Sequence, residues 1–142
     1  MTVGCQRAGA SMFFAGGESG HVMWEENDEK GTGSHIWLTY ETCRQLRTWM
    51  HAGRQAVTAK DAAALHVFVH EMMHTMGEKD EAATECSALA ADEKVFARFA
   101  DGNVDVAQNL YRVYATGVYP TLSSEYLTSC PKTPSVTLPG LS

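Results

Sequence analysis

The sequence predicts a compact α+β fold that is mainly helical and has a small sheet in its N-terminal half. Apolar residues recur at helical spacing in several segments after residue 39. The runs that are rich in β-branched and aromatic residues are short and lie before that point. The chain has 142 residues, of which 44% are hydrophobic, so it can form one core but not two. We expect a single domain over residues 1–130, followed by a loosely ordered tail rich in Pro, Ser and Thr over 131–142.

The N-terminal half is expected to supply the sheet. Residues 6–19 are small, glycine-rich and poorly patterned. The segments His21–Glu25 and His35–Tyr40 carry the β-branched and aromatic residues that are typical of strands. An acidic, glycine-containing loop over residues 25–34 joins the two segments.

The first predicted helix covers Tyr40–His51. Thr39 can act as its N-cap, and Gly53 would end it. Its buried stripe is expected to consist of Cys43, Leu46 and Met50.

A second helix is predicted over Lys60–Met76, because good helix formers open it and Gly77 follows its end. His70 and His74 project from the side opposite to its main apolar stripe, next to further apolar residues. Since both sides of this helix carry apolar residues, we expect it at the centre of the domain. The main stripe consists of Leu65, Phe68, Val69, Met72 and Met76.

The rest of the chain is also expected to be helical. The third helix should reach about Ala100, and the turn 101–103 separates it from a fourth helix over Val104–Thr116, with Gly117 just past the end. A last short helix is expected over Ser123–Thr128. The inward residues of the fourth helix should be Val106, Leu110 and Val113.

The segment His70-Glu71-Met72-Met73-His74 carries the main indication of function. Two histidines four residues apart lie on one face of a helix, one turn above the other. Their rings can converge on one metal ion, and Glu71 between them can reach water bound to that ion. Buried histidines need polar partners, and a metal ion supplies one. The alternative is a pair of core histidines satisfied by hydrogen bonds.

This pattern resembles the His-Glu-x-x-His signature of the zinc metallopeptidases called zincins. The resemblance implies Zn²⁺ bound by His70 and His74, a central active-site helix and a ligand helix after it. It also implies that Glu71 is the general base. Zincins hold the substrate along a sheet edge. The strand at His35–Leu38 is our candidate for that edge, with an ordinary core strand as an equal alternative.

Zinc needs a third protein ligand, and three carboxylates follow the motif. Asp80 would complete a spacing similar to that of the metzincins, but that clan has a later methionine turn, and the last methionine here is Met76. Glu81 and Glu85 instead resemble the gluzincin layout, in which the first acid binds the metal and the second orients a ligand histidine. We therefore expect Glu81 as the third ligand and Glu85 as the orienting residue. Glu85 and Asp80 remain alternative ligands.

A narrower resemblance lies in the Glu-Cys-x-Ala sequence at residues 85–88 and the short turn at Gly77, which look like small secreted actinobacterial proteins of this clan. The implied function is a zinc metalloendopeptidase, a monomer that hydrolyses peptides or proteins through a zinc-activated water. The alternative is a non-catalytic zinc-binding regulatory or interaction protein on the same fold. An intact Glu71 favours the enzyme, because a structural zinc site needs no base.

Many zincins add a Tyr or His that stabilises the oxyanion, and the sequence does not select one. His66 lies one turn before His70, and its position along the helix predicts a surface or supporting residue instead of a ligand. The candidates are Tyr111, Tyr114, Tyr119, Tyr126, His21, His35, His51 and His66.

Composition excludes several classes of partner. The net charge of −6 argues against binding to nucleic acid or to an acidic membrane. No apolar run is long enough to span a bilayer, and Met12–Ala15 is too short for a signal-peptide core. Either the protein is intracellular or its signal peptide is absent from this sequence. We expect the second, a secreted or extracytoplasmic protein.

The four cysteines are widely scattered and form no Cys-x-x-Cys pair, which argues against a structural zinc cage. Their even number in a small domain predicts two disulfides and an oxidising compartment. Of the three possible pairings we expect Cys5–Cys130, which ties the chain ends, and Cys43–Cys86, which ties the first helix to the third. Four reduced cysteines are the alternative.

Overall fold

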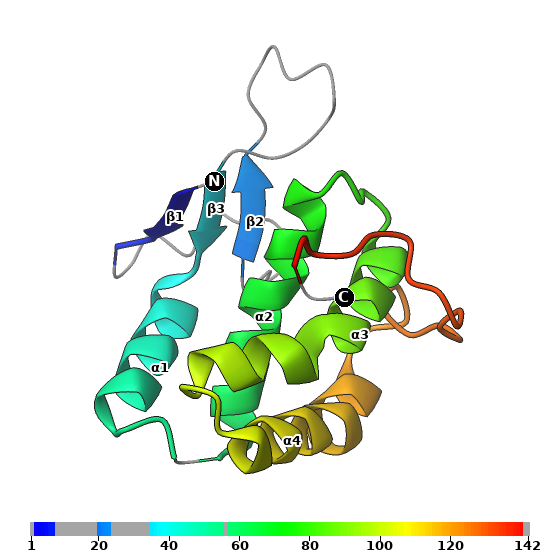
Figure 1. Ribbon diagram of the computed structural model, residues 1–142. Helices are drawn as coiled ribbons and strands as arrows, with labels where there is room; N and C mark the ends of the chain where they lie inside the picture. The colour runs from blue at the N-terminus through cyan, green and yellow to red at the C-terminus, as the bar shows by residue number, and fades with distance from the viewer. Residues whose placement is uncertain (1, 8–19, 24–34, 56, 141–142) are drawn as a thin grey trace.

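Figure 1 shows a computed structural model of the chain, which describes residues 2–7, 20–23, 35–55 and 57–140. These residues form four α-helices and a three-stranded sheet. The fold is therefore α+β and mainly helical, with its sheet in the N-terminal part, as predicted.

The sheet has the strand order β1-β3-β2, where β1 is Thr2–Cys5, β2 is Gly20–Met23 and β3 is His35–Leu38. β1 pairs with β3 in parallel, and β2 pairs with it in antiparallel. β1 was not predicted, because four residues without clear alternation give little signal. The predicted strand over residues 21–25 is present as β2, although Trp24 and Glu25 lie outside the described residues, as do the segments 8–19 and 24–34.

β3 is the middle strand, so the prediction that His35–Leu38 forms the sheet edge is wrong. Its side chains alternate: Ile36 and Leu38 are buried, whereas His35 and Trp37 are exposed. The alternative of a core strand holds instead. Of the described strands, β2 is an outer one, and it lies beside the central helix α2 (Figure 1).

Helix α1 (Tyr40–His51) begins as predicted, with the Thr39 side chain accepting a hydrogen bond from the Thr42 backbone N–H. Cys43 is buried in its inward stripe. Met50 is 40% exposed, however, and Trp49 is buried in its place. Neighbouring residues lie about 100° apart around a helix, so the inward face includes only one of the two. That face is turned toward Trp49, whose large indole removes more apolar surface from water than the Met50 side chain would.

Helix α2 (Ala59–Thr75) runs through the middle of the molecule, between the sheet and the two later helices (Figure 1). A capping box between Thr58 and Asp61 begins it, and Gly77 follows its end with the left-handed φ of +101°. Apolar residues on one side join the main core, and those on the other pack against the sheet. The predicted central position is therefore confirmed. The residues that join the main core are Leu65, Val69 and Met73. Those that pack against the sheet are Val67, Phe68 and Met72.

Helix α3 (Glu81–Phe99) also begins at a capped residue, since Oδ1 of Asp80 accepts a hydrogen bond of 2.8 Å from the backbone N–H of Ala83. Helix α4 covers Val104–Val113 and then continues as a π turn over Tyr114–Val118.

The end of α4 differs from the prediction. Gly117 lies inside the π turn and has no positive φ, so it is not the residue that ends an α-helix. Pro120 follows in a short 3₁₀ segment, Tyr119–Thr121, because it has no N–H for a helical hydrogen bond. The helix predicted over Ser123–Thr128 is absent, and that segment makes a turn.

All four cysteines are in disulfides, which confirms the number predicted, but the pairing is wrong. Cys5 is bonded to Cys43 and Cys86 to Cys130. β1 lies beside β3, and α1 begins directly after β3, so Cys5 comes within 5.9 Å of Cys43 between Cα atoms. The prediction failed because it did not include β1. Two disulfides fit a protein of an extracytoplasmic compartment.

The C-terminal segment over residues 131–140 has no helix or strand, but it contacts the rest of the domain. Val136 and Leu138 pack against the main core, and the Ser135 hydroxyl lies 3.1 Å from that of Ser87. None of the helices within the described residues is both long and apolar enough to cross a membrane.

Candidate metal centre

Helix α2 carries three histidines on one face, one turn apart. His66, His70 and His74 are each at most 9% exposed, and the ring centroids of neighbours lie 6.2 Å and 4.9 Å apart. Helix α3 packs against this face and adds Glu81 and Glu85, which are also one turn apart. Together these side chains form two groups that have the geometry of a metal site.

The outer group consists of His70, His74 and Glu81. The Nε2 atom of His70 lies 3.0 Å from Oε2 of Glu81, and Nε2 of His74 lies 3.5 Å from the same oxygen. One ligand atom of each of the three residues lies within 4.8 Å of those of the other two. Two imidazole nitrogens and one carboxylate oxygen form a ligand set that zinc accepts, with a fourth position left for water. The structure therefore brings the three predicted ligands together.

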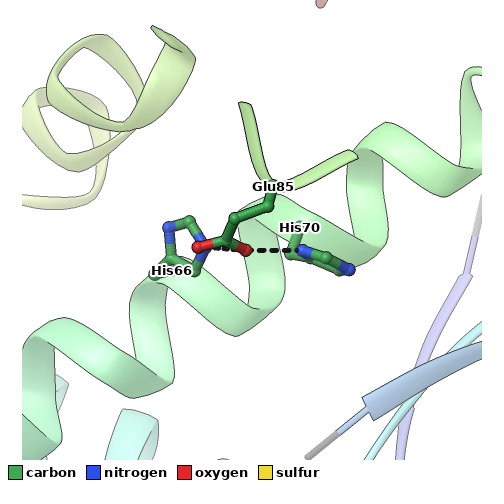
Figure 2. A group of neighbouring side chains, drawn as sticks. All are labelled: His66, His70 and Glu85. Atoms are coloured by element: carbon green, nitrogen blue, oxygen red, sulfur yellow. Dashed lines mark hydrogen bonds and ion pairs between the residues drawn. The ribbon is translucent and has the colours of Figure 1, made fainter. Parts of the chain in front are cut away.

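The inner group consists of His66, His70 and Glu85 (Figure 2). Oε2 of Glu85 lies 2.9 Å from Nε2 of His66 and 3.0 Å from Nδ1 of His70. Both groups contain His70, which turns a different nitrogen to each of them. A neutral imidazole has only one lone pair, so His70 cannot serve both groups as a neutral ligand.

The hydrogen-bond partners of the two motif histidines favour the outer group. Nδ1 of His74 lies 2.7 Å from the carbonyl oxygen of Glu78, and Nδ1 of His70 faces the Glu85 carboxylate. Both partners can only accept, so each Nδ1 carries a hydrogen, and each Nε2 is the nitrogen that can bind a metal once its own proton is lost. The two Nε2 atoms are those that face Glu81.

In the inner group, hydrogen bonds from the histidines already occupy the position that a metal would take. His66 lies between Glu85 and Asp92, with its Nδ1 2.7 Å from Oδ2 of Asp92. Burial lowers the pKa of His66, but these two carboxylates outweigh it and raise the pKa to about 9. Burial raises the pKa of Glu85, but hydrogen bonds from His66 and His70 bring it far below its usual range. Because His66 donates from both nitrogens, it has no lone pair for a metal.

Asp80, the alternative third ligand, belongs to neither group. Its carboxylate is exposed and caps α3, as described above. The spacing that resembles the metzincins therefore brings no third ligand to the histidines, and Glu81 and Glu85 are the acids beside them.

Glu71 is 5% exposed and lies directly beneath β2. A Cβ atom added to Gly20 would be 2.9 Å from Cγ of Glu71 and 3.1 Å from its Oε1. The glycine therefore allows the strand to approach the carboxylate more closely than any other residue would.

A cavity of about 640 Å³ opens over these groups. Gly20, His21 and Val22 of β2 line one side of it, and the segment Thr121–Ser123 lines another. Four of the eight candidates for the oxyanion-stabilising residue also line it. They are His21, His66, Tyr114 and Tyr126.

Tyr126 is one of these four, and the centre of its ring lies 6.0 Å from that of His70.

The pKa values of His70 and His74 are both above the usual value for histidine. Burial lowers both, but hydrogen bonds outweigh it: His70 bonds to Glu81 and Glu85, and His74 bonds to Glu81 and the Glu78 carbonyl. A metal must therefore displace protons, so its apparent affinity should decrease in acid.

Sequence reasoning missed the surroundings of Glu85. His66 is 2% exposed, so a surface position for it is wrong. The hydroxyl of Tyr114 donates a hydrogen bond of 2.6 Å to Oε1 of Glu85, and Asp92 is completely buried. The spacing of four residues between His66 and His70 was a usable signal. Nothing local in the sequence pointed to Asp92 or Tyr114, because packing of three helical segments brings them there.

The buried His66 makes a testable prediction about stability and pH. Its folded-state pKa of about 9 lies above the usual pKa of 6.5 for histidine, so its contribution to stability is complete below about pH 6.5 and is lost as the pH rises toward 9. We expect the free energy of unfolding of chelator-treated protein to decrease over that range. His66→Gln should flatten this part of the profile in urea titrations without reductant. Equal slopes for wild type and variant would contradict the assignment.

Comparison of this chain with protein-family models, with curated proteins and with solved structures gives no match. We therefore infer the function from the chemistry and the geometry of the residues described above.

Proposed function

We propose that this protein is a zinc-dependent metallopeptidase, the activity implied by the resemblance of residues 70–74 to the zincin signature. One observation carries the proposal. The Nε2 atoms of His70 and His74 lie 3.0 Å and 3.5 Å from the same carboxylate oxygen of Glu81, Oε2, beside a cavity that Glu71 also lines. A metal site without catalysis needs no carboxylate at that position.

His70, His74 and Glu81 would hold the zinc. When bound, zinc lowers the pKa of a water ligand toward about 7 and polarises the carbonyl of the scissile bond. Glu71 is the general base: its carboxylate removes a proton from the attacking water and delivers it to the leaving amine. Glu85 accepts a hydrogen bond from Nδ1–H of His70 and so orients the ring of this ligand.

The substrate is a peptide or protein segment in extended form. β2 lines the cavity with Gly20, His21 and Val22, and it is an outer strand of the described sheet. A peptide that pairs along β2 would lie over Glu71 and the motif histidines, with its main chain fixed by hydrogen bonds. The edge is thus β2 instead of β3. Two disulfides suit the secreted location that we propose for the enzyme.

Gly20→Ala should decrease cleavage without removing zinc. The new Cβ would meet Cγ of Glu71 at 2.9 Å, so the carboxylate or the strand must shift. A displacement of about 1 Å at a catalytic group can decrease the rate by roughly 10²-fold. Gly117→Ala is the matched control, because a Cβ at that position has nothing within 4 Å. Wild-type cleavage by Gly20→Ala would contradict the proposed position of the base.

The direct test of the function is a cleavage assay on a broad peptide mixture, analysed by mass spectrometry. The protein is kept without reductant so that both disulfides remain. Cleavage should stop after treatment with a chelator and return when Zn²⁺ is added. Cleavage that continues in the chelator, or zinc-loaded protein that cleaves no peptide, would count against the proposal.

A further inference from the structure

A buried row of polar side chains extends from the protein core to the candidate metal centre. It runs from Asp92 through His66 and Glu85 to His70. We infer that Asp92, His66 and Tyr114 form a clamp, here called the Glu85 clamp, which fixes the Glu85 carboxylate on His70 and so positions this histidine to bind the metal. The inference rests on the proposed metal site and adds three positioning residues to it.

The carboxylate of Glu85 is held at both oxygens. Oε2 accepts hydrogen bonds from His66 and His70, and Oε1 accepts one from the Tyr114 hydroxyl, at distances between 2.6 and 3.0 Å. The side chain is 2% exposed, so water cannot easily replace these donors. A carboxylate with His70 as its only partner could rotate about its side-chain bonds. Three donors from two elements prevent that rotation.

His66 is in turn fixed on three sides. Its two nitrogens donate to Glu85 and Asp92, and the Tyr114 ring stacks on its face, with centroids 3.7 Å apart and 16° between the ring planes. Asp92 has no exposed surface and lies on α3, two turns after Glu85. The arrangement gives the positive imidazolium a carboxylate on each side, which a buried charge requires.

Tyr114 reaches the clamp at the point where α4 changes into the π turn over Tyr114–Val118. Single π turns inside helices are frequent at functional sites. Here the turn begins at the residue whose hydroxyl touches Glu85 and whose ring covers His66. Both contacts come from one side chain, so Tyr114 connects the end of α4 to the histidine face of α2.

The clamp should act on the metal through His70. A carboxylate that accepts a hydrogen bond from Nδ1–H of a ligand histidine fixes the tautomer and makes Nε2 a stronger ligand for the metal. Loss of such partners typically weakens metal binding by about 10–100-fold. A purely structural role would instead lower stability without changing the affinity of the folded protein for zinc. Zinc affinity therefore distinguishes the two roles.

The first test uses Tyr114→Phe, which removes one hydroxyl and keeps the stacked ring. Tyr111→Phe is the matched control, since it removes a hydroxyl from the same helix outside the cavity. Zinc dissociation constants are measured by competition with a chromophoric chelator. Tyr114→Phe should weaken zinc binding by a few-fold up to about 10-fold, which is less than the loss expected on removing the Glu85 carboxylate itself. The control should bind zinc as the wild type does.

The second test is a double-mutant cycle of His66→Gln and Glu85→Gln. If His66 acts through Glu85, its substitution should weaken zinc binding in the wild type but add nothing in the Glu85→Gln protein. If His66→Gln does not fold, Tyr114→Phe takes its place in the cycle. The visible spectrum of the Co²⁺-loaded proteins reports the ligand geometry and should change with each clamp variant but not with Tyr111→Phe.

The outcomes separate the clamp from the metal site. A wild type that binds zinc tightly, with clamp variants of equal affinity or with additive losses in the cycle, overturns the clamp alone. A wild type that binds no zinc overturns the proposed metal centre and the clamp with it.

Discussion

Glu71→Gln should decrease peptide cleavage by roughly 10²–10⁴-fold, which is the usual contribution of a general base. Glutamine has nearly the same size as glutamate and can still donate and accept hydrogen bonds, but it cannot take a proton at neutral pH. Zinc content and the thermal midpoint should therefore remain near those of the wild type. The measurement is the initial rate on the best peptide found in the mixture assay.

Glu125→Gln is the matched control, because Glu125 is an exposed carboxylate that also lines the cavity. Its cleavage rate should remain within a few-fold of wild type. Equal rates for Glu71→Gln and wild type would mean that Glu71 is not the base. Loss of zinc together with activity would instead assign Glu71 a role in holding the metal.

Removal of a ligand should have the largest effect on the metal itself. His70→Ala, His74→Ala and Glu81→Ala each leave two protein ligands of the outer group. We expect these variants to lose zinc during dialysis against a weak chelator, and elemental analysis measures the loss. His51→Ala is the control, because His51 is exposed at the end of α1.

The acids that follow the motif provide a graded comparison. Glu85→Ala should weaken zinc binding by about 10–100-fold, because Glu85 contacts a ligand histidine and not the metal. Asp80→Ala should retain the metal, since Asp80 caps α3 outside both groups. If Asp80→Ala loses zinc and Glu81→Ala does not, the assignment of the third ligand is wrong.

The parts of the fold that the sequence predicted well have local signals. Thr39 caps α1, and Gly77 ends the turn after α2 with a positive φ. Both signals act within a few residues, so a single sequence reveals them. The apolar residues on both sides of α2 likewise indicated its central position. The spacing of four residues between His70 and His74 is also a local signal, and it predicted correctly that they lie one turn apart on a helix.

The parts that could not be predicted depend on contacts between distant segments. β1 is four residues long and is recognisable as a strand only from its pairing with β3. Without that pairing, the disulfide between Cys5 and Cys43 could not be inferred. Met50 and Trp49 could each have faced inward, and the packing decides between them. Tyr114 contacts Glu85 from the first residue of the π turn, and the periodicity of the sequence reveals neither the turn nor the contact.

We propose that this chain binds one zinc ion at the outer group. Native mass spectrometry of the protein, expressed with zinc and then exposed to a small excess of Zn²⁺, tests it most directly. We expect one Zn²⁺ per chain and no second ion, because the inner group holds protons and His70 offers one lone pair. A folded protein that remains free of metal in the presence of Zn²⁺, or one that binds two ions, would contradict the claim.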